Sequence, residues 1–163
     1  MTKKKQKILP QTTLIIKQGF LKKFLSDVGW GQSVLGFRPV TNVLQLSDLD
    51  IGFNKGDILC SLSAIDDGSA KEFIYRNGNN IYDIFIQRQG ENAFAYTNVC
   101  PHAGTPLNMD EGRFMEKTGR YLMCHTHGAL FQLEDGFCVA GPCNGASLTG
   151  IEILVVDGNI TVG

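Results

Sequence analysis

Four side chains with metal-binding chemistry lie in two short stretches of the second half of the chain. The first stretch is Cys100-Pro101-His102 and the second is Cys124-His125-Thr126-His127. Each contributes one thiolate and one imidazole, so together they offer two sulfur and two nitrogen ligands. Such a set suits either a single tetrahedral zinc ion or a two-iron cluster with unlike ends.

The spacing of these residues separates the two kinds of site. Zinc fingers usually place two Cys in one knuckle and two His in the other. Here each knuckle is mixed, C-x-H followed by C-x-x-H, so both Cys can hold one iron and both His the other. The pattern therefore favours an iron–sulfur centre, with a structural zinc site as an alternative.

The surroundings of the two stretches resemble the Rieske [2Fe-2S] proteins, in which two His replace two Cys on one of the two irons. Residues 100–107 (CPHAGTPL) are similar to the first Rieske cluster loop, and residues 124–131 (CHTHGALF) to the second. Gly141-Pro142 stands where the family carries a proline loop that covers the cluster. The similarity runs from about Ile58 to the C-terminus.

This resemblance implies one [2Fe-2S] cluster as the cofactor. Cys100 and Cys124 would bind its inner iron as thiolates, and His102 and His127 would bind its outer iron. Because two imidazoles replace two anionic thiolates, the cluster is less negative and its reduction potential lies above that of an all-Cys plant-type cluster. The histidine edges, which are solvent-accessible in this family, would be the exit for the electron.

Two glycines and a third histidine complete the loops. Gly104 and Gly128 follow the ligands and are expected to permit tight turns that bring backbone N–H groups near the sulfurs. His125 lies outside the motif, and we expect it to be a loop residue without metal.

Departures from the respiratory members of the family bear on the potential. Their disulfide between the two loops cannot form here, because its positions are Thr105 and Thr126. Hydroxyl groups that would donate hydrogen bonds to the cluster region are replaced by Ala129 and Phe131. Fewer donors stabilise the reduced cluster less, so we predict the low end of the Rieske range, near roughly −150 mV.

The resemblance implies an electron carrier. Oxygenase catalytic subunits usually have Arg after the first His, where this chain has Ala103, and no His follows His127 to bind a second iron. We therefore expect a ferredoxin that passes single electrons between a reductase and an oxygenase or other acceptor, with no substrate site of its own. The alternative is a regulatory module whose cluster reports redox state or iron supply.

Cys138 and Cys143 are not part of the ligand pattern. They form either a redox-sensitive pair beside the cluster or two free thiols in a loop of small residues. We favour free thiols, because a reducing compartment disfavours a bridge.

The pattern from Ile58 onward predicts an all-β fold. Short strands are expected over 58–62, 72–76, 81–88, 93–98, 121–123, 129–133, 151–156 and 159–162, separated by Gly- and Asn-rich turns. Residues 81–88 are apolar on both faces, so this strand is expected to be buried on both. The family resemblance sharpens this to a Rieske-like antiparallel β-sandwich, with the cluster loops as a small subdomain, over residues 58–163.

Residues 1–57 are expected to form an N-terminal extension. A basic tail covers 1–11, an amphipathic helix covers Thr12–Val28, and a connector with one short strand around 41–46 follows. The helix could pack on the domain or a second subunit, or lie on a membrane surface or partner. Residues 1–26 lack Asp and Glu, so an organellar presequence is a further alternative.

Charge and cysteine usage suggest partners and compartment. Residues 58–163 hold six basic and twelve acidic side chains, a balance that disfavours nucleic acid and either attracts a basic docking face or merely solvates the surface. The sequence contains no apolar run of membrane-spanning length and no standard export signal. These features, with five cysteines, predict a cytoplasmic protein.

Overall fold

The computed structural model describes residues 42–163. The predicted helix at Thr12–Val28 and the basic tail lie outside the described residues. Within 42–163 the chain forms strands and two short 3-10 helices, Leu46–Asp48 (η1) and Leu62–Ala64 (η2). The prediction of an all-β fold is confirmed.

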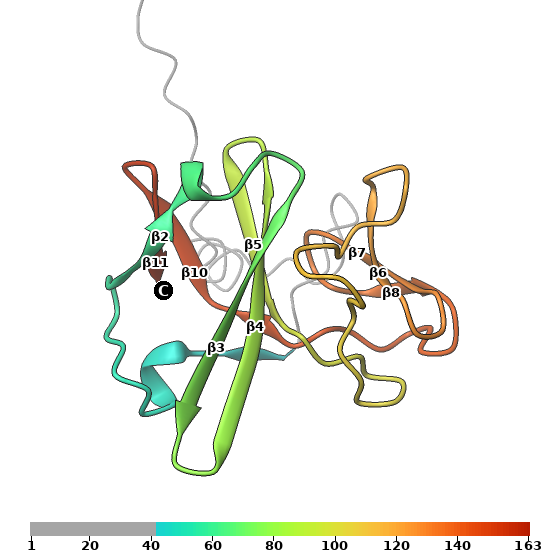
Figure 1. Ribbon diagram of the computed structural model, residues 1–163, viewed down its shortest axis with the longest axis horizontal. Helices are drawn as coiled ribbons and strands as arrows, with labels where there is room; N and C mark the ends of the chain where they lie inside the picture. Colours follow the sequence, from blue (N-terminus) through green and yellow to red (C-terminus); the bar gives the residue numbers. More distant parts are fainter. Residues whose placement is uncertain (1–41) are drawn as a thin grey trace, which may run out of the picture. The chain divides into compact units, whose positions relative to one another are not determined.

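The strands form three sheets (Figure 1). A five-stranded sheet has the order β1-β9-β5-β4-β3, comprising Val43–Leu44, Gly150–Ile151, Asn92–Thr97, Asn80–Gln89 and Ala70–Asn77. A three-stranded sheet has the order β10-β11-β2, comprising Ile153–Val156, Asn159–Val162 and Ile58–Ser61. A second three-stranded sheet, β6-β7-β8, comprises Tyr121–Cys124, Ala129–Gln132 and Cys138–Ala140.

Strand β4 lies between two hydrophobic cores, as its apolar sequence predicts. Ile84 and Ile86 join the core shared with β2 and the closing hairpin β10–β11. Phe85, on the opposite face, joins the core of the β6–β8 subdomain. Because side chains alternate along a strand, the two faces of β4 contribute to two cores, one in the sandwich and one in the β6–β8 subdomain. In Figure 1 the β6–β8 sheet lies on the other side of β4 and β5 from β2, β10 and β11.

Aromatic contacts attach the subdomain to the large sheet. The rings of Phe85 and Phe114 stack with centroids 3.8 Å apart and an interplanar angle of 11°. The hydroxyl of buried Tyr96 on β5 donates to the carbonyl oxygen of Leu133, just after β7, at 2.7 Å. Burial of this hydroxyl raises the pKa of Tyr96, so it stays a donor at any ordinary pH. The subdomain is thus held against a rigid strand pair.

The structure differs from the predicted strands at two places. The single strand expected over 151–156 is divided at Glu152, with β9 in the large sheet and β10 in the small one. Strand β8 was not predicted, because its three residues lie in a stretch of small side chains. The short strand expected around 41–46 is present as β1, which pairs in parallel with β9. The domain boundary at 57/58 stays a prediction.

Candidate metal centre

The two cysteine loops close in the same way. Cys124 ends β6, and Cys100 follows β5 after two intervening residues. The carbonyl oxygen of Cys100 accepts a hydrogen bond from Gly104 N, and that of Cys124 accepts one from Gly128 N, both at 2.8 Å. The two glycines have φ values of 70° and 71°, a conformation that a side chain disfavours. The glycine turns expected from the sequence are therefore present.

The four predicted ligands are placed as two layers. The thiols of Cys100 and Cys124 are buried, each 1% exposed. His102 and His127 are exposed on the surface, with ring centroids 4.9 Å apart and an interplanar angle of 86°. Residues far apart in the sequence thus give a sulfur pair inside and an imidazole pair outside.

Backbone and hydroxyl donors surround the two sulfurs. Burial raises the pKa of Cys100, against hydrogen bonds from the backbone N–H groups of His102 and Ala103. Burial acts in the same direction on Cys124, but hydrogen bonds from Cys100, from backbone N–H groups and from the Thr126 hydroxyl lower its pKa overall. Such donors stabilise a thiolate, which is the form that binds a metal.

Direct contacts join the two cysteine loops. His125 N donates to Leu107 O at 2.7 Å. The hydroxyl oxygens of Thr105 and Thr126 lie 3.4 Å apart, at the positions where the respiratory relatives are expected to carry a disulfide. A hydrogen bond can therefore link the loop tips where no covalent bridge can form.

The third loop, residues 141–146, packs against the second cysteine loop through Gly141. This glycine has a φ of 99°, and a Cβ built on it would lie 2.7 Å from Ala129 Cα. Ala129 is fully buried at the start of β7, one residue after Gly128. The close approach requires the absence of a side chain at residue 141.

A buried amide anchors the first loop to the large sheet. Asn98, which is 2% exposed, accepts a hydrogen bond from Leu107 N at 2.8 Å. Its Nδ2 donates to Asn108 Oδ1 at 2.9 Å and to Asp83 Oδ2 at 3.2 Å. Asn98 follows β5, so it connects the loop to strands β4 and β5. Sequence analysis missed this residue, because an Asn near a strand end gives no specific signal.

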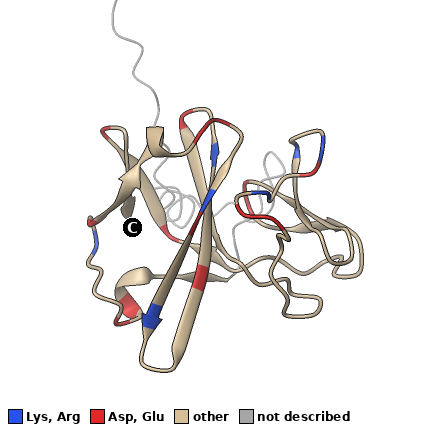
Figure 2. Cartoon of the chain, viewed as in Figure 1, with Lys and Arg blue, Asp and Glu red and all other residues tan. Residues whose placement is uncertain are grey.

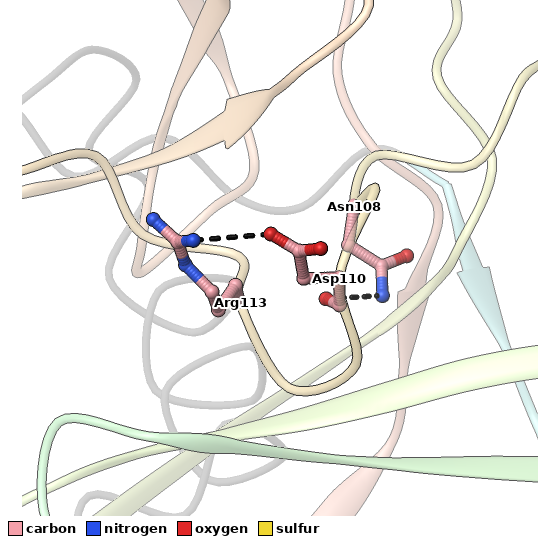
Figure 3. A network of polar contacts seen from close by, with 3 residues as sticks. All are labelled: Asn108, Asp110 and Arg113. Atoms are coloured by element: carbon pink, nitrogen blue, oxygen red, sulfur yellow. Dashed lines mark hydrogen bonds and ion pairs between the residues drawn. The ribbon is translucent and has the colours of Figure 1, made fainter.

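The segment after the first loop is held in turn by polar contacts. Glu72 on β3 accepts hydrogen bonds from Asn108 Nδ2 and Gly112 N, both at 2.8 Å. Asn108 also donates to Asp110 O at 3.1 Å, and Arg113 forms an exposed ion pair with Asp110 at 3.0 Å (Figure 3). The part-buried contacts of Glu72 matter more here, because exposed ion pairs contribute little.

Replacing Asn98 with alanine is expected to lower the free energy of unfolding by about 2–4 kcal/mol, because it orphans the buried Leu107 N–H and two acceptors. The midpoint of chemical unfolding of the anaerobic, cluster-loaded protein measures this. Asn79→Ala, in the exposed β3–β4 turn, is the control and should change stability by less than about 0.5 kcal/mol. Equal midpoints for the two variants would contradict the anchoring role.

Asp83 is expected to make stability depend on pH. Burial raises its pKa, the Asn98 hydrogen bond opposes this shift and Glu72 adds to it. A folded-state pKa above the unfolded value means that stability is lost as pH rises through the folded pKa. The stability of Asp83→Asn relative to wild type should therefore increase as the pH rises from about 4 to about 7. Chemical unfolding at both pH values checks this, and a constant difference would refute it.

The arrangement of the predicted ligands suits a cluster with two unlike ends. They form a buried thiol pair and an exposed imidazole pair, one for each of two irons.

The loops that carry the imidazole pair, and the loop after β8, contain no charged side chain. Residues 98–109, 121–133 and 136–151 contain no Asp, Glu, Lys or Arg. Figure 2 shows the charged residues on other turns and on β3 and β4. These three stretches therefore contribute no charge of their own beside the histidine edges.

Solved structures with similar folds include two from carbazole 1,9a-dioxygenase. Its ferredoxin from Nocardioides aromaticivorans IC177 is 20% identical, with a TM-score of 0.54, over 68% of this chain and 98% of that chain. A chain in the complex of reduced oxygenase and oxidised ferredoxin of carbazole 1,9a-dioxygenase is 21% identical. Its TM-score is 0.51, over 68% of this chain and 91% of that chain. The E. coli protein NirD is 20% identical, with a TM-score of 0.48, over 66% of this chain and 94% of that chain.

The two structures from the carbazole system share the fold of this chain. No curated protein matches the chain. No helix within residues 42–163 has the length and apolar character needed to cross a membrane.

The family model of the Rieske [2Fe-2S] domain matches residues 58–155. This range includes both cysteine loops and the loop that packs against the second of them. The chain belongs to the Rieske [2Fe-2S] domain family, whose cofactor is a [2Fe-2S] cluster.

Proposed function

We propose that this protein is a one-electron carrier whose cluster is held by Cys100, Cys124, His102 and His127. The observation that carries the proposal is the layering of two buried thiols beneath two exposed imidazoles. Buried thiolates and surrounding N–H donors hold the metal away from water, while the imidazole edges reach the surface. Bound there, the cluster would supply reversible one-electron redox chemistry.

We further propose a potential near the low end of the Rieske range, which extends from about −150 to +300 mV. Ala129 and Phe131 are fully buried and have no hydroxyl to donate. The Thr126 hydroxyl lowers the pKa of Cys124, so it is a further donor that was not predicted and that would raise the potential somewhat. Backbone N–H groups supply the remaining donors around the sulfurs.

The proposed partners are a reductase that supplies electrons and an oxygenase or other oxidoreductase that receives them. The ferredoxin and the ferredoxin–oxygenase complex among the similar structures support this class of partner. Contact at the imidazole edges would use the uncharged loops described above, so its rate should depend only weakly on ionic strength. The absence of disulfides among the five cysteines supports a reducing compartment such as the cytoplasm.

Electron paramagnetic resonance of the anaerobic, dithionite-reduced protein, followed by a redox titration, tests the proposal. A rhombic signal with average g below the free-electron value, and a midpoint near the low end of the range, is the expected result. A colourless protein containing zinc would overturn it. A genuine cluster that exchanges electrons only slowly with any reductase would instead favour the regulatory module.

A further inference from the structure

The loop that follows β8 brings two free thiols together. The Sγ atoms of Cys138 and Cys143 lie 3.2 Å apart, and neither is in a disulfide. Cys138 N donates to Ala146 O at 2.8 Å, and Ala146 N donates to Cys143 O at 2.9 Å. The backbone itself therefore folds the loop so that the two sulfurs meet. A disulfide has an S–S bond of about 2.05 Å, so the sulfurs need to approach by only about 1.2 Å.

This thiol pair lies in the same buried core as Cys100 and Cys124, the two predicted thiolate ligands. On the other side of the same loop, Gly141 packs directly against Ala129. The pair is therefore close to the cysteine loops without being part of the ligand set.

The two sulfurs differ in access. Cys138 is fully buried and Cys143 is 8% exposed, while the neighbouring residues Pro142 and Asn144 are exposed. A reagent from solution is therefore expected to reach Cys143 before Cys138.

We propose that Cys138 and Cys143 form a reversible dithiol–disulfide couple that reacts with low-molecular-weight disulfides, separately from electron transfer by the cluster. The Cys143 sulfur, having lost its proton, attacks one sulfur of the small disulfide and releases the other half as a thiolate. The Cys138 sulfur then loses its proton, attacks Cys143 and releases the second half. The two protein thiols lose two electrons and two protons, and one small disulfide becomes two thiols. A dithiol reverses the reaction.

Thiol mapping of the cluster-loaded protein tests the couple directly. The anaerobic protein is incubated with glutathione disulfide, its visible spectrum is recorded, and the remaining thiols are blocked with N-ethylmaleimide after denaturation. Cleavage after Glu134 and Glu152 then releases residues 135–152, whose only cysteines are Cys138 and Cys143. We expect this peptide to lose two hydrogens and to escape labelling, with both labels restored by prior treatment with dithiothreitol. The visible spectrum should show that the cluster is retained.

Two variants serve as controls. Cys60→Ser, on β2, should leave the bridge unchanged, whereas Cys143→Ser should abolish it and leave Cys138 open to labelling. A wild-type peptide that still takes two labels would overturn the proposal, as would a bridge that forms only in cluster-free protein. A bridge between Cys143 and Cys100 would also overturn it.

Discussion

Replacing Cys124 with alanine is expected to leave a protein without the visible absorption and paramagnetic signal of a [2Fe-2S] cluster. Cys124 offers one of two buried thiols at the proposed inner iron, and no other group can replace it at the end of β6. Iron content per chain, measured after anaerobic reconstitution, should fall essentially to zero. The loss is large because one of the two protein thiolates that would hold one iron is removed.

Cys138→Ala is the matched control for this loss. Cys138 is as buried as Cys124 and belongs to the same β6–β8 subdomain, but it is not a proposed ligand. Both variants remove one buried sulfur, so they should create similar packing defects. Only Cys124→Ala should lose the iron. If both variants retain the cluster, or both lose it, the assignment of Cys124 as a ligand is not supported.

The second large effect is expected at Gly141. An alanine there would be strained by the φ of 99°, and its Cβ would lie 2.7 Å from the backbone of Ala129. The strained conformation costs about 1–2 kcal/mol. Displacing a buried backbone costs about 1–3 kcal/mol more. We expect the 141–146 loop to move away from the second cysteine loop, so that the protein is less stable and loses its cluster faster.

Gly145→Ala separates the two causes. Gly145 lies in the same loop with a φ of 92°, but a Cβ there would meet nothing within 4 Å. It should therefore show only the backbone strain, about 1–2 kcal/mol, with a nearly normal rate of cluster loss. Chemical unfolding and the decay of visible absorption in air measure these quantities. Equal effects of the two substitutions would show that the contact with Ala129 has no special importance.

The sequence by itself determined the kind of centre and the kind of fold. The mixed C-x-H and C-x-x-H knuckles carry their chemistry in adjacent residues, so the ligand types and the family were predictable from local spacing. Residues 81–88 are apolar at both odd and even positions, which likewise predicted a strand buried on both faces, because side-chain direction along a strand follows a period of two. Asn77–Asn80 predicted the hairpin turn for the same local reason.

Long-range contacts decided the rest. Asn98 anchors Leu107 only because the loop returns to the end of β5. Glu152 marks a change of sheet since β9 pairs with β5 whereas β10 pairs with β11. The presence of Cys143 and Cys100 in one buried core likewise depends on the path of the whole subdomain.

Each of these features depends on partners distant in the sequence, and spacing along the chain gives no information about which distant groups will meet. The family and its cofactor are encoded in neighbouring residues and could be predicted, whereas the support of the proposed ligands is a property of packing in three dimensions.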